Sequence, residues 1–129
     1  MEIANECCVK TGKKNTGLCV CFGGSNTGQM TGFIARELNK KVGAGIMCPA
    51  GFAPDLKPVM DKLNAQDAII AVDGCPVGCV KKTLEMIGMT PDRYYDLVGD
   101  FGIEKKPGLD FSEDDMKGVV GRIMSDIKE

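Results

Sequence analysis

One apolar run constrains the fold of this chain more than any other feature of its sequence. The run Ala68-Ile69-Ile70-Ala71-Val72 is followed at once by the turn residues Asp73-Gly74-Cys75-Pro76, and then by apolar residues at helical spacing. A short, continuous apolar segment is typical of a strand buried on both faces, and a proline just after a turn indicates the start of a helix. The sequence therefore predicts a strand, a tight turn and a helix that runs from Pro76 to about Ile87.

The same alternation recurs along the chain. We expect further strands at 18–22, 44–48 and 94–98, and further helices at 27–42, from Pro54-Asp55 onward, and from Ser112 to the C-terminal region. Four strands alternating with four helices predict a three-layer α/β domain, with a mostly parallel four-stranded sheet and helices on both faces, of the flavodoxin or Rossmann type. We expect residues 1–17 to form a polar N-terminal segment with a Cys pair, and residues 18–129 to form a single α/β domain.

The cysteine count indicates thiol chemistry. The chain has 129 residues, of which 7 are Cys and none is His. The absence of His excludes His-based catalytic triads, mixed Cys/His zinc sites and haem attachment through a Cys-x-x-Cys-His motif. No segment resembles a signal peptide or has the length to span a membrane, so we expect a cytoplasmic protein without membrane association. In that compartment thiols are kept for metal binding or redox chemistry more often than for structural disulfides.

The charge pattern bears on the partners. The formal net charge is −2, and the basic residues occur as scattered pairs such as Lys13-Lys14 and Lys81-Lys82. Nucleic-acid-binding domains instead concentrate basic residues on one face or stripe. We therefore expect no nucleic-acid partner. The expected partners are a metal ion and a protein or small molecule that the sequence does not identify.

Four cysteines fall where successive strands are predicted to end. Cys21, Cys48 and Cys75 lie at or near the carboxyl ends of three strands, and Cys79 lies one helical turn beyond Cys75. Ligand sites of open α/β sheets lie beyond the carboxyl ends of the strands, where neighbouring strands are about 4.8 Å apart. Cys75 and Cys79 also lie close to a predicted helix N-terminus, which favours the thiolate form. The pattern predicts a shared metal or redox site at this edge.

The remaining motifs leave alternatives open. Cys19 lies deeper in its strand and is interpreted as a core residue, whereas the adjacent Cys7 and Cys8 could be accessory ligands, a redox pair or uninvolved. The segment Gly23-Gly24-Ser25-Asn26-Thr27-Gly28-Gln29 could cap a helix, hold an anion or orient Cys21. Asp73 is interpreted as a helix cap or as an acceptor that orients the site.

Three blocks of the sequence resemble a known family. These are Phe22 to Gln29, Met47-Cys48-Pro49-Ala50-Gly51, and the long block Val72-Asp73-Gly74-Cys75-Pro76-Val77-Gly78-Cys79-Val80-Lys81-Lys82-Thr83-Leu84. They resemble the DGC family of proposed zinc-binding proteins, which is named for the Asp-Gly-Cys triplet. The resemblance runs from about Leu18 to the end of the chain. It implies a small α/β domain with four recurrent cysteines proposed as metal ligands, which correspond to Cys21, Cys48, Cys75 and Cys79.

The leading hypothesis is a zinc-binding domain in which Cys21, Cys48, Cys75 and Cys79 hold one Zn²⁺. Four sulfur ligands saturate a tetrahedral ion, which favours a structural, sensing or metal-handling role over catalysis. One alternative is a thiol–disulfide redox protein or an iron–sulfur electron carrier that uses the same cysteines. Another is a binding module whose loop at residues 23–29 holds a phosphorylated small molecule.

Overall fold

The computed structural model describes residues 10–11 and 14–128, and its centre is a parallel sheet. The strands β2 (Lys14–Val20), β3 (Gly45–Ile46), β4 (Ala68–Asp73) and β5 (Arg93–Asp96) lie parallel in the order β3-β2-β4-β5. A short strand, β1 (Lys10–Thr11), pairs antiparallel with the beginning of β2. The predicted sheet is confirmed, and its parallel strands follow the flavodoxin-like order, in which the first strand lies between the second and the third.

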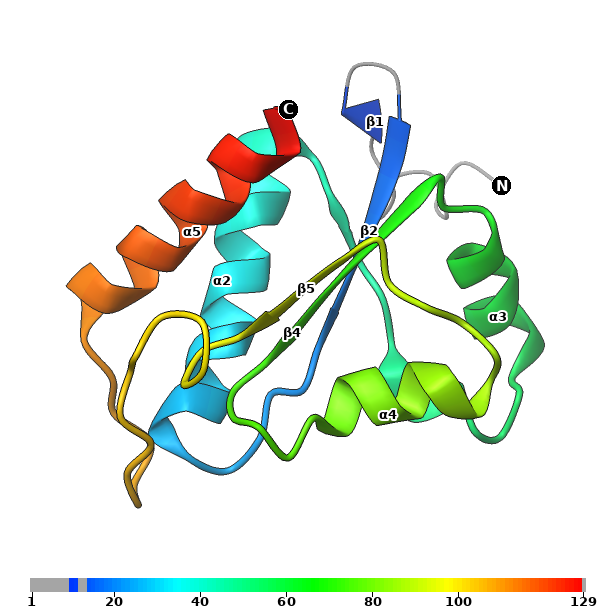
Figure 1. Ribbon diagram of the computed structural model, residues 1–129. Helices are drawn as coiled ribbons and strands as arrows, with labels where there is room; N and C mark the ends of the chain where they lie inside the picture. The colour runs from blue at the N-terminus through cyan, green and yellow to red at the C-terminus, as the bar shows by residue number, and fades with distance from the viewer. Residues whose placement is uncertain (1–9, 12–13, 129) are drawn as a thin grey trace.

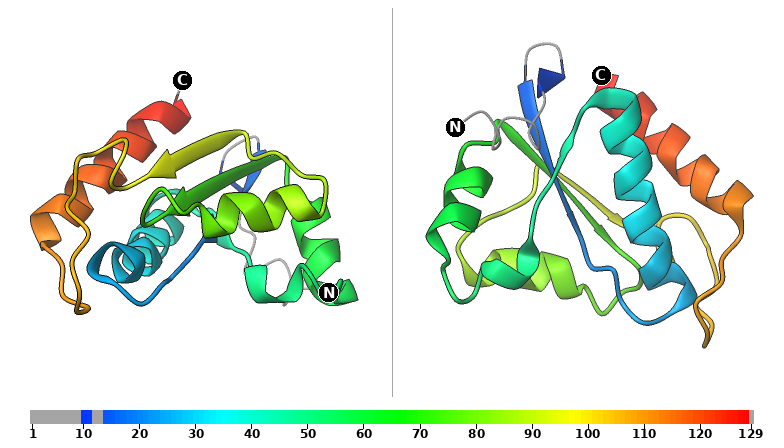
Figure 2. Two further views of the ribbon diagram at one scale, coloured as in Figure 1. Left: turned by 60° about the horizontal axis from the view of Figure 1, so that its bottom comes forward. Right: turned by 180° about the vertical axis from the view of Figure 1, so that it is seen from behind.

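Helices cover both faces of this sheet. The helices are α2 (Asn26–Val42), α3 (Lys57–Asn64), α4 (Cys79–Met86) and α5 (Glu113–Lys128), and a 3₁₀ turn, η1 (Pro49–Gly51), follows β3. Figures 1 and 2 show α2 and α5 on one face of the sheet and α3 and α4 on the other. The three-layer α/β architecture is therefore confirmed. No helix within the described residues combines the length and the apolar character needed to cross a lipid bilayer.

The two faces of the sheet have separate hydrophobic cores. Side chains alternate along a strand, so that Ile70 and Val72 of β4 pack towards α2 and α5, whereas Ile69 and Ala71 pack towards α3 and α4. Both faces of β4 are buried, which explains why its sequence is continuously apolar. The sheet is thereby held from both sides, and the loops at its carboxyl edge start from a rigid frame.

The start of α4 differs from the prediction. The helix begins at Cys79 rather than at Pro76, and its N-cap is Gly78, which has a left-handed backbone with φ 71°. Before it, the Gly78 N–H donates to the carbonyl of Cys75 at 3.2 Å and closes a turn. A left-handed residue cannot continue a right-handed helix, so Pro76 belongs to the turn. Cys75 consequently lies before the helix, and Cys79 is its first residue.

Two other boundaries were also predicted wrongly. β2 begins at Lys14 rather than at Leu18, because residues without a large apolar side chain extend its ladder: Thr16 pairs with Ala68 and Gly17 with Ile69. α3 begins at Lys57 rather than at Pro54-Asp55, because Asp55 has φ 59° and ends a turn. In both places the backbone determines the boundary, whereas the prediction followed the apolar side chains.

Candidate thiol site at the carboxyl edge of the sheet

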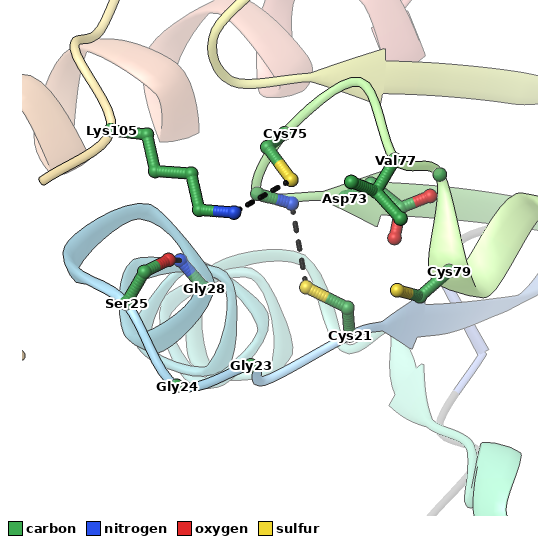
Figure 3. Close-up of a pocket in the computed structure, with 12 residues that line it drawn as sticks. Cys21, Gly23, Gly24, Ser25, Gly28, Asp73, Cys75, Val77, Cys79 and Lys105 are labelled. Atoms are coloured by element: carbon green, nitrogen blue, oxygen red, sulfur yellow. Dashed lines mark hydrogen bonds between the residues drawn. The ribbon is translucent and has the colours of Figure 1, made fainter. Parts of the chain in front are cut away.

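A cavity of about 290 Å³ lies where β2 and β4 end, and three of the predicted cysteines line it. Cys21 comes directly after β2, Cys75 lies in the turn after β4, and Cys79 opens α4. Figure 3 shows the three thiol groups around the same space. The other walls are the glycine-rich start of α2, the turn before α4 and the side chain of Lys105. Segments that are more than fifty residues apart in sequence thus present their thiols to one cavity.

Cys21 and Cys75 each accept a hydrogen bond at sulfur. The Gly74 N–H donates to the Cys21 Sγ at 3.4 Å, and the Lys105 Nζ donates to the Cys75 Sγ at 3.4 Å. The Thr31 hydroxyl also lies 3.9 Å from the Cys21 Sγ. Each of these two sulfurs thus already accepts a hydrogen bond from a donor outside the set of cysteines.

Cys48 does not line this cavity. It is exposed and precedes the 3₁₀ turn η1, whose Pro49 and Ala50 line a neighbouring pocket together with Cys21 and Cys79. Cys48 is therefore the residue directly before two that line this neighbouring pocket, and Cys21 and Cys79 line both the pocket and the main cavity. As the side chains are placed in the described part of the chain, no three His, Cys, Asp or Glu groups are arranged to hold a metal ion.

The other cysteines lie apart from the cavity or outside the described residues. Cys19 is fully buried within β2, and burial raises the pKa of its thiol to about 12. A thiol that stays protonated and has no access to solvent fills the core, so the interpretation of Cys19 is confirmed. The Cys7-Cys8 pair lies outside the described residues.

Two glycines allow the loops that carry the cysteines to approach each other. A Cβ on Gly74 would lie 2.7 Å from the Gly28 backbone nitrogen, and a Cβ on Gly28 would lie 2.6 Å from the Gly23 carbonyl oxygen. These distances are shorter than a carbon atom tolerates. The loop after Cys21 therefore folds back onto the start of α2 only because position 28 lacks a side chain, and the turn after β4 touches the start of α2 only because position 74 lacks one. This contact brings Cys21 and Cys75 to the same cavity.

Asp73 is a buried helix cap. Only 1% of its surface is exposed, and its carboxylate accepts hydrogen bonds from the backbone N–H groups of Val80 at 2.9 Å and Lys81 at 3.1 Å. The Tyr94 hydroxyl donates to the same carboxylate at 2.8 Å. The N-cap residue Gly78 has no side chain with which to satisfy these N–H groups, so Asp73 does so from the strand. The predicted capping role is confirmed, and the carboxylate holds the helix that presents Cys79.

The loop between β2 and α2 is organised around Ser25 and Thr31. Ser25 is the N-cap of α2, and its side chain accepts from the Gly28 N–H at 3.1 Å. Thr31 accepts from the Phe22 N–H at 2.9 Å, and Phe22 has the left-handed φ of 47°. A bulky residue in this conformation is uncommon and indicates that the surrounding structure enforces the sharp turn after Cys21. The capping interpretation of the loop is confirmed for Ser25.

Sequence reasoning missed Lys105 and Tyr94 as neighbours of the site. Lys105 is one of a scattered pair of lysines, and Tyr94 was assigned only to a strand. Their roles depend on loop geometry and on the pairing of β4 with β5, which places Tyr94 beside Ala71, two residues before Asp73. The one available signal for Tyr94 was a tyrosine within a predicted strand, because the hydroxyl of a tyrosine that packs in a core usually finds a hydrogen-bond partner.

Comparison with known proteins places this geometry in a family. The family model described as DGC domain matches residues 17–123, a span that contains the whole cavity and Cys48. The chain is also 30% identical over 95 residues to the "Anaerobic and virulence modulator AnvM" of Pseudomonas aeruginosa, an alignment that covers 74% of this chain and 72% of that protein. No solved structure matches the chain.

Proposed function

The chain belongs to the DGC domain family, and on this premise we propose that it binds one zinc ion through the thiolates of Cys21, Cys48, Cys75 and Cys79. The observation that carries the proposal is the convergence of three of these thiols on one cavity of about 290 Å³. Cysteine is a preferred zinc ligand in structural sites. The sequence contains no His, so sulfur is the donor set that this chain offers for such a metal.

The proposal includes a small movement of the four cysteine side chains that brings their sulfur atoms to the zinc ion. Rotation about one side-chain torsion repositions each Sγ, and metal binding commonly orders its own ligands. The turn at residues 75–78 and η1 are short irregular segments that permit small adjustments. Cys48 would join from the position just before η1, whose Pro49 and Ala50 already line a pocket with Cys21 and Cys79.

A zinc ion with four thiolates has no open coordination position. This favours a structural, sensing or metal-handling role over Lewis-acid catalysis. The relative is named an anaerobic and virulence modulator, and among the three roles we propose sensing for this chain on that ground. A cytoplasmic location belongs to the same proposal.

The first experiment is to determine metal and acid-labile sulfide in protein purified without oxygen and without added metal. About one zinc per chain and no sulfide is the expected result. Iron with an equivalent amount of sulfide would replace zinc by an iron–sulfur cluster on the same ligands. Protein that contains no metal and takes up none when zinc is added would contradict the proposal.

Single substitutions then test the ligand set. Cys21→Ser, Cys75→Ser and Cys79→Ser are each expected to lower zinc affinity at least a hundredfold, because serine does not replace a zinc-bound thiolate. Cys19→Ala is the matched control, because it removes a buried thiol two residues before Cys21 that does not line the cavity. Undiminished affinity in Cys48→Ser would remove Cys48 from the ligand set.

A second candidate function is thiol–disulfide redox chemistry. Cys21 and Cys79 line both the main cavity and the neighbouring pocket, so they form a wall that the two share. A small-molecule disulfide could oxidise this pair: one thiolate attacks a sulfur, a thiolate leaves, and the second cysteine thiolate displaces the other half. Reversible formation of a disulfide between Cys21 and Cys79 in metal-free protein, detected by mass spectrometry after mild oxidation, would support this candidate.

A further inference from the structure

We infer that Lys105 is a charge-balancing residue of the metal site and that Asn26 holds it in position. The inference rests on the proposed function and assigns a role to two residues that are not metal ligands. Lys105 lies thirty residues beyond Cys75 in sequence, yet its Nζ donates to the Cys75 Sγ at 3.4 Å. Figure 3 shows the lysine side chain extending from its loop towards this sulfur.

Asn26 clamps the backbone on both sides of Lys105. Its side-chain amide donates to the Glu104 carbonyl at 2.8 Å, and its side-chain oxygen accepts from the Lys106 N–H at 2.7 Å. Asn26 is the first residue of α2 and only 5% of its surface is exposed. A carboxamide matches this pair of backbone groups because it carries one acceptor and donors on the same plane. The clamp therefore ties the position of Lys105 to the same helix start that forms one wall of the cavity.

The expected role follows from electrostatics. A zinc ion with four thiolates carries two negative charges in excess, and cations or N–H donors that bond to the sulfurs compensate part of that charge. The Gly74 N–H compensates part of this charge at Cys21, and Lys105 supplies a full positive charge at Cys75. Groups outside the ligand set that bond to the ligands typically change metal affinity by about 10-fold to 100-fold.

The test measures zinc affinity by competition with a chromogenic chelator, using the reduced chain of 129 residues. Lys105→Met is expected to weaken zinc binding by about 10-fold to 100-fold, and Lys105→Arg to retain most of the affinity. Lys106→Met is the matched control, because it removes a neighbouring charge from the same loop, and it should bind zinc like the native chain. The free energy of unfolding of each metal-free variant, measured in urea, verifies that the variants are folded.

A double-mutant cycle tests the clamp. Asn26→Ala should weaken zinc binding in the native background and should add no further loss to Lys105→Met, because Asn26 acts through Lys105. Additive losses would overturn the role of Asn26, since they would show that it acts independently of the lysine. Equal zinc affinity in Lys105→Met and the native chain would overturn the role of Lys105. Failure of the native chain to bind zinc would instead overturn the proposed function and this inference together.

Discussion

The two tyrosines of the chain are neighbours in β5, and their side chains point to opposite faces of the sheet. Each tyrosine donates a hydrogen bond from its hydroxyl to an aspartate. Tyr94 points towards the core beneath α4 and donates to Asp73 at 2.8 Å. Tyr95 points towards α2 and α5 and donates to Asp126 of α5 at 2.7 Å. The same residue type and the same bond thus occur on both faces, and the difference between the two sites lies in what the aspartate does.

On the thiol side, the aspartate is part of the framework of the site. Asp73 is buried, and besides Tyr94 it binds two N–H groups at the start of α4. The Lys81 ammonium lies 5.0 Å above the Tyr94 ring, which ties the helix to the tyrosine a second time. Asp73 and Tyr94 therefore both support the start of α4, whose first residue is Cys79.

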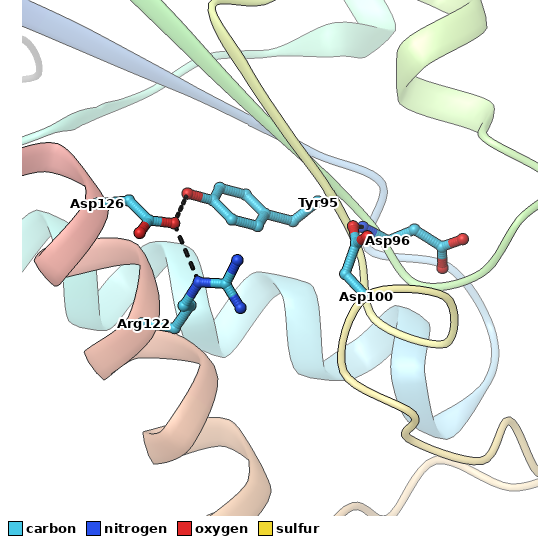
Figure 4. A network of polar contacts seen from close by, with 5 residues as sticks. All are labelled: Tyr95, Asp96, Asp100, Arg122 and Asp126. Atoms are coloured by element: carbon cyan, nitrogen blue, oxygen red, sulfur yellow. Dashed lines mark hydrogen bonds and ion pairs between the residues drawn. The ribbon is translucent and has the colours of Figure 1, made fainter.

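On the other face, the aspartate belongs to the protein surface. Asp126 accepts from Tyr95 and from the Arg122 Nε at 3.2 Å, one helical turn earlier in α5 (Figure 4). Arg122 also lies over the Phe101 ring at 5.7 Å. These contacts fasten α5 to the face of the sheet opposite α4, the helix that carries Cys79. The comparison teaches that the Tyr94–Asp73 pair combines stability with positioning of the site, whereas the Tyr95–Asp126 pair contributes stability alone.

The largest expected effect is at Asp73. Asp73→Asn replaces an acceptor of three hydrogen bonds by an amide that must turn its NH₂ towards at least one backbone N–H group. We expect a loss of about 2–3 kcal/mol in the free energy of unfolding, because hydrogen bonds to a buried charged group are among the strong ones. Zinc affinity should fall as well, because Cys79 loses its fixed position. Urea unfolding and chelator competition measure the two quantities.

Asp126→Asn is the control for this substitution. It should destabilise the protein less than Asp73→Asn, because the carboxylate is partly exposed and solvent replaces its contacts. It should leave zinc affinity unchanged. The comparison between the two faces fails if Asp126→Asn alters zinc affinity as much as Asp73→Asn does.

The next effect compares the tyrosines directly. Tyr94→Phe and Tyr95→Phe each remove one hydroxyl donor, and each should lower the free energy of unfolding by about 1 kcal/mol. Only Tyr94→Phe is expected to weaken zinc binding, by less than Asp73→Asn, because Asp73 keeps its two N–H donors. Identical zinc affinities in the two variants would show that the tyrosine is not needed to place α4. Both quantities come from the same two assays.

The fold was predictable from the sequence because its signals are local and redundant. The apolar alternation of strands and helices predicted the sheet and the layers, and the helix predicted at 27–42 does end at Val42, before Gly43 with its φ of 74°. The start of α4 was not predictable from the proline alone. Its position depends on the left-handed backbone of Gly78 and on a cap supplied by Asp73 from the preceding strand. Both features depend on tertiary structure, and the helix propensities of single residues do not predict them.

The site was predictable only in part, for a similar reason. The carboxyl-edge rule correctly brought Cys21, Cys75 and Cys79 to one cavity. The same rule does not specify how far a side chain on a short turn reaches, and Cys48 lies beside the cavity instead of lining it. Lys105 left no local signal, because its position depends on a clamp from Asn26 nearly eighty residues earlier in the chain.

The smallest expected effect is a difference in pH dependence between the two tyrosine variants. Burial and the hydrogen bond to Asp126 raise the pKa of Tyr95 to about 12, whereas a tyrosine in an unfolded chain has a pKa of about 10. Between these values the unfolded chain loses the proton and the folded chain keeps it. The contribution of Tyr95 to stability is therefore complete below pH 10 and is lost as the pH rises towards 12. Burial and the bond to Asp73 raise the pKa of Tyr94 as well.

The two tyrosine variants are expected to differ in how their unfolding free energy depends on pH at the acid end. The hydrogen bond from Tyr95 lowers the pKa of Asp126 below its ordinary value, so the contribution of Asp126 is present above about pH 3.9 and is lost as the pH falls through the lowered pKa. Tyr95→Phe removes the main cause of that shift. It should flatten the profile of unfolding free energy against pH at both its acid and its alkaline ends, relative to the native chain. Tyr94→Phe should flatten the alkaline end and leave the contribution of Asp126 at the acid end intact. Urea unfolding across this pH range measures both profiles. If the unfolding free energies of the two variants depend on pH in the same way at the acid end, the hydrogen bond from Tyr95 does not lower the pKa of Asp126, and the assigned role of the Tyr95–Asp126 pair is wrong.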